Sequence, residues 1–128
     1  TWSGTDSGWD TSPRWDAGTV EAIDLNCWLH LDHLFLARMA TLLKRPPEEV
    51  SRWKGKADAS AESIQSHLWD AAAGVFWDRL PLTSEYSNQS AAFVKVVTPA
   101  TFWTLLTGVA TYDQASRMIS TLLTPNNL

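Results

Sequence analysis

An almost continuous run of apolar residues between positions 24 and 44 predicts one long helix. Apolar side chains recur there at spacings of three and four, and further leucines fill much of the opposite side. A helix that is hydrophobic on nearly all sides is normally buried over most of its surface. Asp24 is the expected N-cap, and Pro46-Pro47 is expected to stop the helix. We therefore expect this helix to lie inside a larger helical assembly.

The next segment predicts a helix with one solvent-facing side. A single apolar stripe runs from Pro47 to about residue 70, and Gly74 is expected to end the helix. Two short strand-like runs follow, at 75–79 and 92–97. The first two helices should therefore form a hairpin whose connection is only a few residues long.

Two further helices are expected towards the end of the chain. Pro99 occupies the position at which proline favours the start of a helix. Thr111 and Gln114 have the spacing of a capping box, which predicts a last helix over 112–123. The expected fold class is all-α, with about four helices and a short strand-like hairpin. Because the first helix is apolar all round, we favour a place in a larger helical ring over a closed four-helix bundle.

Length, charge and cysteine content exclude several classes of protein. A chain of 128 residues is one domain or a piece of one. Its net charge of −4, without a cluster of Lys and Arg, argues against a nucleic-acid partner. A single Cys excludes an internal disulfide framework and a Cys-based zinc site, and the apolar runs are too interrupted for a transmembrane helix. The chain begins at Thr1 rather than Met, so we expect an internal stretch of a longer protein.

The first sixteen residues hold the side chains best suited to chemistry. Trp9 offers a flat apolar surface for a sugar ring, and Asp10 places a carboxyl beside it, where partial desolvation would keep that carboxyl protonated. Gly8 permits close approach of the backbone to a ligand, and Arg14 can hold a hydroxyl or a second carboxylate. Together these groups could form a carbohydrate site. On spacing alone, a structured surface loop with capping Asp residues is the simpler interpretation.

Four segments of the chain resemble a known group of glycosidases. Residues 5–16, TDSGWDTSPRWD, resemble the ESGWDxSxRW signature of trehalases and of the related mannosyl-oligosaccharide glucosidases and mannosylglycerate or glucosylglycerate hydrolases. Residues 22–26 are similar to the VDLN motif that opens the next helix of those enzymes, and residues 68–79 resemble LWDxxxGxFxDR. Residues 95–115 resemble KVxTPAxFxPLxxGxAxxxQA. The resemblance covers nearly the whole chain, in order and in spacing.

This resemblance implies a partial (α/α)6 barrel, in which six helical hairpins form a ring. Residues 1–128 would then be an internal fragment of one catalytic domain, with an acid-bearing loop over 1–18 and helical hairpins over 24–123. The implied activity is inverting cleavage of an α-glycosidic bond in trehalose, glucosylglycerate, mannosylglycerate or a related α-glucoside. No metal or organic cofactor is implied, because two carboxylates suffice for this reaction. The implied partners are a small carbohydrate and the rest of the barrel, with no nucleic acid and no membrane.

The same resemblance assigns roles within the first segment. The general acid of these enzymes is the Asp of SGWD, which falls on Asp10. Their base is a Glu far downstream, so this chain is expected to carry one catalytic carboxylate and to lack the other. Asp6 stands where the family usually has Glu. Pro13 and Asp16 are closer to the mannosylglycerate hydrolases, whereas Thr5 is not the Trp that those enzymes often have there. The expected substrate contacts are Gly8, Trp9, Arg14 and Trp15, with Asp6 and Asp16 as supporting residues.

Other polar side chains have simpler interpretations than a site. His30 and His33 lie in the apolar helix, where packing or helix-to-helix hydrogen bonding explains them better than a metal does. Cys27 is expected to be a small buried apolar residue, and Lys95 a solvated charge.

A different class of function also fits the Trp-rich loop, namely a non-catalytic helical module that binds sugars or partner proteins. Flanking sequence that continues into a Glu-bearing helix would favour the enzyme. Sugar affinity without turnover would favour the module.

Overall fold

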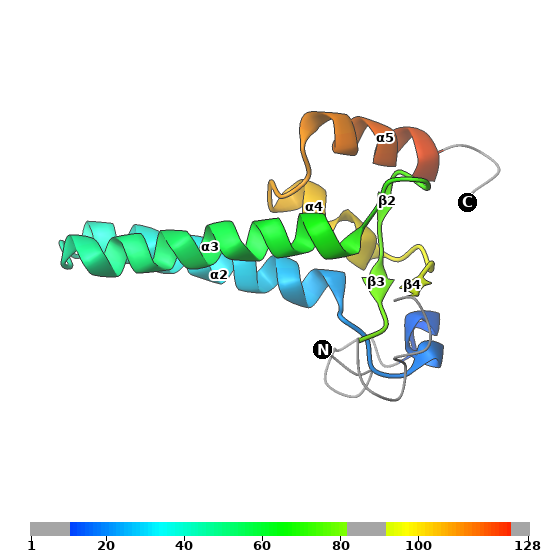
Figure 1. The fold of residues 1–128 in the computed structure, drawn as a ribbon, viewed down its shortest axis with the longest axis horizontal. Helices are drawn as coiled ribbons and strands as arrows, with labels where there is room; N and C mark the ends of the chain where they lie inside the picture. Colours follow the sequence, from blue (N-terminus) through cyan, green and yellow to red (C-terminus); the bar gives the residue numbers. More distant parts are fainter. Residues whose placement is uncertain (1–10, 82–91, 124–128) are drawn as a thin grey trace.

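The computed structural model describes residues 11–81 and 92–123 (Figure 1). This part of the chain is mostly helical, as the sequence predicted, and it holds two small strand hairpins where the sequence predicted one. Two long helices project as one hairpin from a smaller body that holds the strands and the last helices (Figure 1). The elements in chain order are η1 (Pro13–Ala17), α2 (Ile23–Leu42), α3 (Pro47–Leu68), β1 (Trp69–Asp70), β2 (Val75–Phe76), β3 (Asp78–Arg79), β4 (Phe93–Val94), η2 (Pro99–Phe102), α4 (Trp103–Leu106) and α5 (Tyr112–Leu122).

The turn between α2 and α3 spans residues 43–46. Lys44 has a φ of 51°, a left-handed conformation that helps to reverse the chain within a few residues. Pro47 is the first residue of α3, where the missing N–H breaks no helical hydrogen bond. The predicted hairpin is therefore present, with α2 ending at Leu42 rather than at Lys44.

Two histidines join α2 to α3. The Nδ1 atom of His30 lies 3.0 Å from the carbonyl oxygen of Ala57, and the Nδ1 atom of His33 lies 3.0 Å from the Oγ atom of Ser60. His33 also lies beside Trp53, with 6.1 Å between ring centroids. The predicted helix-to-helix hydrogen bonding of these histidines is confirmed.

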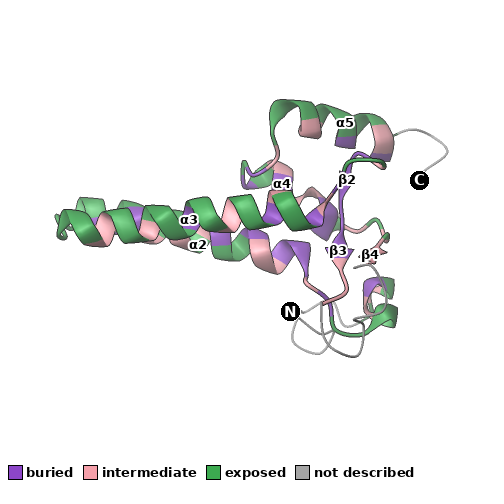
Figure 2. Cartoon of the chain, in the orientation of Figure 1, coloured by how far each residue is buried: buried purple, intermediate pink, exposed green. Residues whose placement is uncertain are grey.

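One side of α2 remains open to solvent. Trp28, Phe35 and Leu42 are 45%, 55% and 72% exposed, and exposed residues predominate along the projecting hairpin (Figure 2). Within residues 11–81 and 92–123, α3 therefore covers only part of a helix whose composition predicts burial on most sides. No helix in these ranges is both long and apolar enough to cross a membrane.

The core lies where the base of the hairpin meets the strands and α5. β1 pairs with β2 in one antiparallel ladder, and β3 pairs with β4 in another. Phe76 is fully buried and packs against Trp69, with 4.7 Å between the ring centroids. Buried residues of both long helices, the strands and α5 join in one cluster, which includes Ile23, Cys27, Ile64, Leu68, Val75, Met118 and Leu122.

Gly74 does not end α3, and this prediction is wrong. The helix stops at Leu68, because Trp69 already pairs with Phe76 across the first ladder. Gly74 lies in the turn that joins those strands, where its φ of 72° suits a residue without a Cβ. Because Trp69 pairs with Phe76, α3 ends earlier than the apolar stripe along α3 predicted.

The predicted capping box of α5 is confirmed. The backbone N–H of Gln114 donates to the Oγ1 atom of Thr111 at 3.2 Å, and the backbone N–H of Thr111 donates to the Oε1 atom of Gln114 at 2.9 Å. We expect Thr111→Ala to lower the free energy of unfolding by about 1 kcal/mol, because a helix N–H loses its acceptor. Urea unfolding measures this change. Ser116→Ala, an exposed substitution inside α5, is the control, and an equal effect of the two substitutions would contradict the capping role.

Candidate active site

The predicted site residues divide into two groups. Three of them lie in the short helix η1, within the acid-bearing loop and after Asp10. These three are Arg14, Trp15 and Asp16. The others lie outside the described residues, and they are Asp6, Gly8, Trp9 and Asp10.

Arg14 is enclosed by two carboxylates that come from distant parts of the chain. Its Nη1 and Nη2 atoms donate to Oδ2 and Oδ1 of Asp24 at 2.8 and 2.9 Å. Its Nε and Nη2 atoms donate to Oδ2 and Oδ1 of Asp78 at 2.7 and 2.8 Å. The side chains of Arg14, Asp24 and Asp78 are 1%, 2% and 6% exposed. These three residues are called the Arg14 cluster below.

Both carboxylates also contact backbone N–H groups at the start of α2. The N-cap residue is Ala22, so the prediction that Asp24 caps this helix is wrong. The Oδ1 atom of Asp78 accepts a hydrogen bond from the backbone N–H of Ile23 at 2.8 Å. A residue 55 positions away thus satisfies the helix N–H of Ile23, while Asp24 binds Arg14 and the backbone N–H of Leu25, at 3.0 Å.

Burial and charge act in opposite directions within the Arg14 cluster. Burial alone lowers the pKa of Arg14, but the hydrogen bond with Asp24 and the charges of Asp78 and Asp24 raise that pKa above its usual value. Burial raises the pKa of Asp78, and the charge of Arg14 with the N–H of Ile23 opposes that rise. One cation between two carboxylates leaves an excess negative charge, which the positive end of the α2 dipole favours.

These contacts give Arg14 partners that the sequence did not predict. A guanidinium group has five N–H donors, and Arg14 uses its Nε and both Nη atoms on carboxylates. In the structure Arg14 therefore anchors η1 to α2 and β3. Direct contact between Arg14 and a substrate hydroxyl stays a prediction.

Trp15 and Asp16 lie at the outer part of this anchored turn. Trp15 is half-buried, and the Cζ atom of Arg14 lies 4.6 Å from the centroid of its ring. The backbone N–H of Trp15 donates to the carbonyl of Ser12 at 3.1 Å, and Gly18 donates back to the carbonyl of Trp15 at 2.9 Å. Asp16 is exposed. Substrate contact by Trp15 and a supporting role for Asp16 stay predictions.

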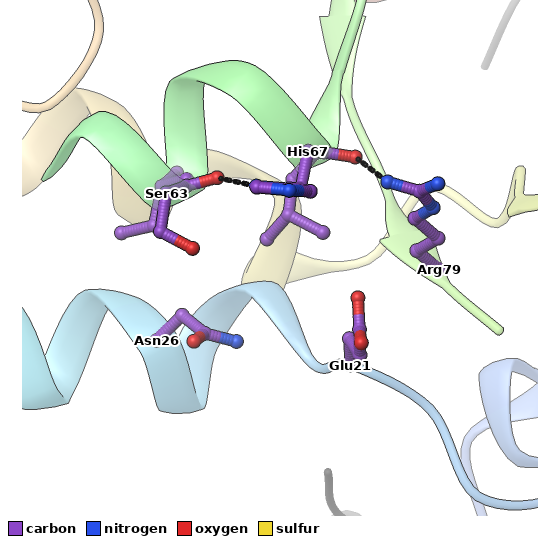
Figure 3. Close-up of a pocket in the computed structure, with 7 residues that line it drawn as sticks. Glu21, Asn26, Ser63, His67 and Arg79 are labelled. Atoms are coloured by element: carbon purple, nitrogen blue, oxygen red, sulfur yellow. Dashed lines mark hydrogen bonds between the residues drawn. The ribbon is translucent and has the colours of Figure 1, made fainter. Parts of the chain in front are cut away.

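A pocket of about 300 Å³ opens between the N-terminal end of α2 and the C-terminal end of α3 (Figure 3). The Nη1 atom of Arg79 donates to the carbonyl of His67 at 3.3 Å, and the buried Nε atom of Arg79 has no partner among the described residues. Glu21 and Arg79 hold the pocket edge together through their backbones, at 2.7 and 3.3 Å. The lining residues are Glu21, Asn26, Ser63, Ile64, His67, Leu68 and Arg79.

Sequence reasoning did not identify this pocket or the partners of Arg14. Asp78 and Arg79 lie in the segment that resembles LWDxxxGxFxDR, so the motif held the signal without indicating what the two side chains contact. Within residues 11–81 and 92–123, no group of three His, Cys, Asp or Glu side chains is placed to hold a metal ion.

Lys95 is paired rather than simply solvated. Its Nζ atom lies 2.7 Å from the Oδ2 atom of Asp70, although the Lys95 side chain is 57% exposed. Asp70 also accepts hydrogen bonds from the backbone N–H groups of Ala72 and Ala73. The hydrogen bond with Lys95, followed by that with Ala73, lowers the pKa of Asp70. This ion pair joins the end of β1 to the segment after β4.

Cys27 is buried in the core, as predicted, and burial raises the pKa of its thiol to about 12. The thiol of the unfolded chain ionises near pH 8.5, so the stability that the neutral thiol contributes falls as the pH rises from there towards 12. When the pH rises from 8 to 10, the free energy of unfolding should fall in both proteins. We expect the fall to be about 1 to 2 kcal/mol smaller in Cys27→Ala than in the parent protein, because the variant has no thiol to ionise. Urea unfolding at both pH values measures the difference, and equal losses would contradict the raised pKa.

A comparison with protein families gives one match over the chain. The model of the mannosylglycerate hydrolase MGH1-like glycoside hydrolase domain matches residues 1–128. The match includes the acid-bearing loop, the Arg14 cluster and the pocket residues. It confirms the resemblance to mannosylglycerate hydrolase-like glycosidases that the sequence motifs indicated.

Proposed function

Because the chain belongs to the mannosylglycerate hydrolase MGH1-like glycoside hydrolase family, we propose that it supplies the general acid for inverting cleavage of an α-glycosidic bond. The proposed substrates are glucosylglycerate, mannosylglycerate, trehalose or a related α-glucoside. The observation that carries this proposal is the segment Ser7-Gly-Trp-Asp10, in a chain whose whole length matches a glycoside hydrolase domain.

In the proposed reaction, Asp10 protonates the glycosidic oxygen as the bond to the sugar breaks. Trp9 supports the sugar ring, Gly8 allows the backbone to approach it, and Trp15 completes the contact. A second carboxylate on the opposite face activates the attacking water, at about 6.5–9.5 Å from the first. Water then adds from the face opposite the leaving group, which inverts the anomeric centre.

We propose that this second carboxylate lies outside residues 1–128. The buried carboxylates of the described residues support the proposal, because each of them already binds a cation. Asp24 and Asp78 bind Arg14, and Asp70 binds Lys95. None of these three is free to activate water.

Proton NMR of the first product tests this function. The complete gene product is incubated with each α-glycoside, and the anomer released first is recorded before mutarotation. Release of the β-anomer of the sugar that water attacks is the expected result, accompanied with trehalose by an equal amount of α-glucose from the leaving group. Release of the α-anomer alone would contradict the inverting mechanism. Sugar affinity without turnover of any α-glycoside would favour the non-catalytic module instead.

Residues 1–128 expressed alone test the position of the base. We expect poor solubility, because Trp28, Phe35 and Leu42 leave α2 apolar on its open side, and no turnover. Turnover by this chain alone, lost on Asp10→Asn, would place the base within these residues.

A further inference from the structure

We propose that the Arg14 cluster is the positioning device of the general acid: Arg14, held by Asp24 and Asp78, sets where Asp10 meets the glycosidic oxygen. This role rests on the proposed function of Asp10. It makes Asp24 and Asp78 positioning residues for the reaction, in addition to their contacts with the start of α2. It also gives Arg14 a task other than direct contact with substrate.

The first argument is that the Arg14 cluster joins three separate segments at one buried point. Arg14 lies in η1 within the acid-bearing loop, Asp24 lies in the first turn of α2, and Asp78 lies in β3. The two carboxylates are 10 and 64 residues away from Arg14 in the sequence. Asp78 additionally binds the N–H of Ile23, so α2 and β3 are held to each other as well as to η1. The turn that carries Arg14 therefore has a defined place on the fold.

The second argument is the short covalent distance from Arg14 to the acid. Asp10 precedes Arg14 by four residues, and four extended residues span at most about 14 Å. Anchoring Arg14 thus limits where the Asp10 carboxyl can lie. Protonation of the leaving oxygen requires a heavy-atom distance of about 2.6–3.2 Å, and loss of the anchor would widen the range of positions open to the Asp10 carboxyl.

The third argument is that the geometry needs an arginine and not only a positive charge. The planar guanidinium presents paired N–H groups to each carboxylate, two towards Asp24 and two towards Asp78. A lysine ammonium is a point charge that cannot form both paired contacts. Arg14→Lys therefore keeps the charge of the cluster and removes its directional hold.

Two substrates that differ in leaving group test the proposal in the complete gene product. An alkyl α-glycoside needs protonation of its leaving oxygen, whereas the α-glycosyl fluoride of the same sugar needs little. For Arg14→Lys we expect kcat to fall about 10- to 100-fold on the alkyl glycoside and less than about 3-fold on the fluoride, with KM nearly unchanged. The pH profile of kcat/KM on the alkyl glycoside should also shift on its alkaline side, where the general acid titrates.

A second variant keeps the test decisive if Arg14→Lys does not fold. Asp24→Asn leaves Arg14 paired with Asp78 alone, so the buried charges balance while half of the hold on Arg14 is lost. We expect the same selective loss on the alkyl glycoside, smaller in size. The control is a substitution of the buried Leu122 in α5, to Val or Ala, chosen to match the loss of melting temperature. This control should affect both substrates equally and weakly.

The outcomes separate the two proposals. Asp10→Asn must itself show the selective loss on the alkyl glycoside; if it does not, Asp10 is not the general acid, and the positioning role fails with it. If Asp10→Asn shows the selective loss but Arg14→Lys and Asp24→Asn behave like the Leu122 control, the Arg14 cluster serves only the stability of the fold. Selective loss in both cluster variants supports the positioning role.

Discussion

Replacing Asp10 with Asn is expected to reduce kcat on an alkyl α-glycoside by about 10²- to 10⁴-fold. The amide cannot donate the proton that the leaving oxygen needs, and the substitution changes the size of the side chain very little. Substrate contacts through Trp9 and Trp15 would remain, so KM should change much less than kcat. Initial rates with the purified complete gene product measure both constants.

An exposed aspartate elsewhere in the chain provides the matched control. Asp58 lies on the surface of α3, and Asp58→Asn makes the same chemical change without touching the acid-bearing loop. We expect its kcat and KM to equal those of the parent protein. A kcat for Asp10→Asn within a few-fold of the control would show that the acid lies elsewhere.

The second large effect concerns stability, and it follows from the Arg14 cluster. Arg14→Met is expected to lower the free energy of unfolding by about 3–5 kcal/mol, because it leaves Asp24 and Asp78 buried without their cation. Such a loss is a large fraction of the stability of an ordinary domain. Urea unfolding followed by circular dichroism measures it.

Two further variants show whether this loss comes from the unpaired carboxylates. Arg45 forms an exposed ion pair with Glu49, at 3.0 Å, and Arg45→Met should cost no more than about 1 kcal/mol. Adding Asp24→Asn and Asp78→Asn to Arg14→Met removes the buried charges and should recover part of the lost stability. A triple variant less stable than Arg14→Met would contradict this explanation.

The helices of the hairpin were predictable from local rules. The apolar spacing of α2, the proline at the start of α3 and the stripe along α3 all depend on residues within a few turns of one another. The capping box of α5 is equally local, because Thr111 and Gln114 are three residues apart. These features matched the structure to within a few residues.

Side-chain and strand pairing beyond one helical turn accounts for the predictions that failed. Asp24 has the residue type of an N-cap, but it lies inside the first turn of α2, where it binds the guanidinium of Arg14 and the backbone N–H of Leu25. Gly74 has the residue type of a helix-ending glycine, but the pairing of Trp69 with Phe76 ends α3 earlier. Arg14 lies ten residues before Asp24 and Phe76 lies seven residues after Trp69, so both partners lie beyond the three- or four-residue spacing from which helix ends are predicted.

The family was also predictable, because the motif around Asp10 and the order of the later motifs are written in the sequence. The role of Asp10 as the acid stays a prediction. The partners of Arg14 were not predictable. Arg14 contacts Asp78 across 64 residues, and spacing along a chain does not state which distant side chains meet. The sequence by itself thus determined the helices and the kind of chemistry. Only the tertiary structure decided that Arg14 anchors η1 to α2 and β3. A buried guanidinium needs charged hydrogen-bond partners, and folding brings Asp24 and Asp78 to Arg14.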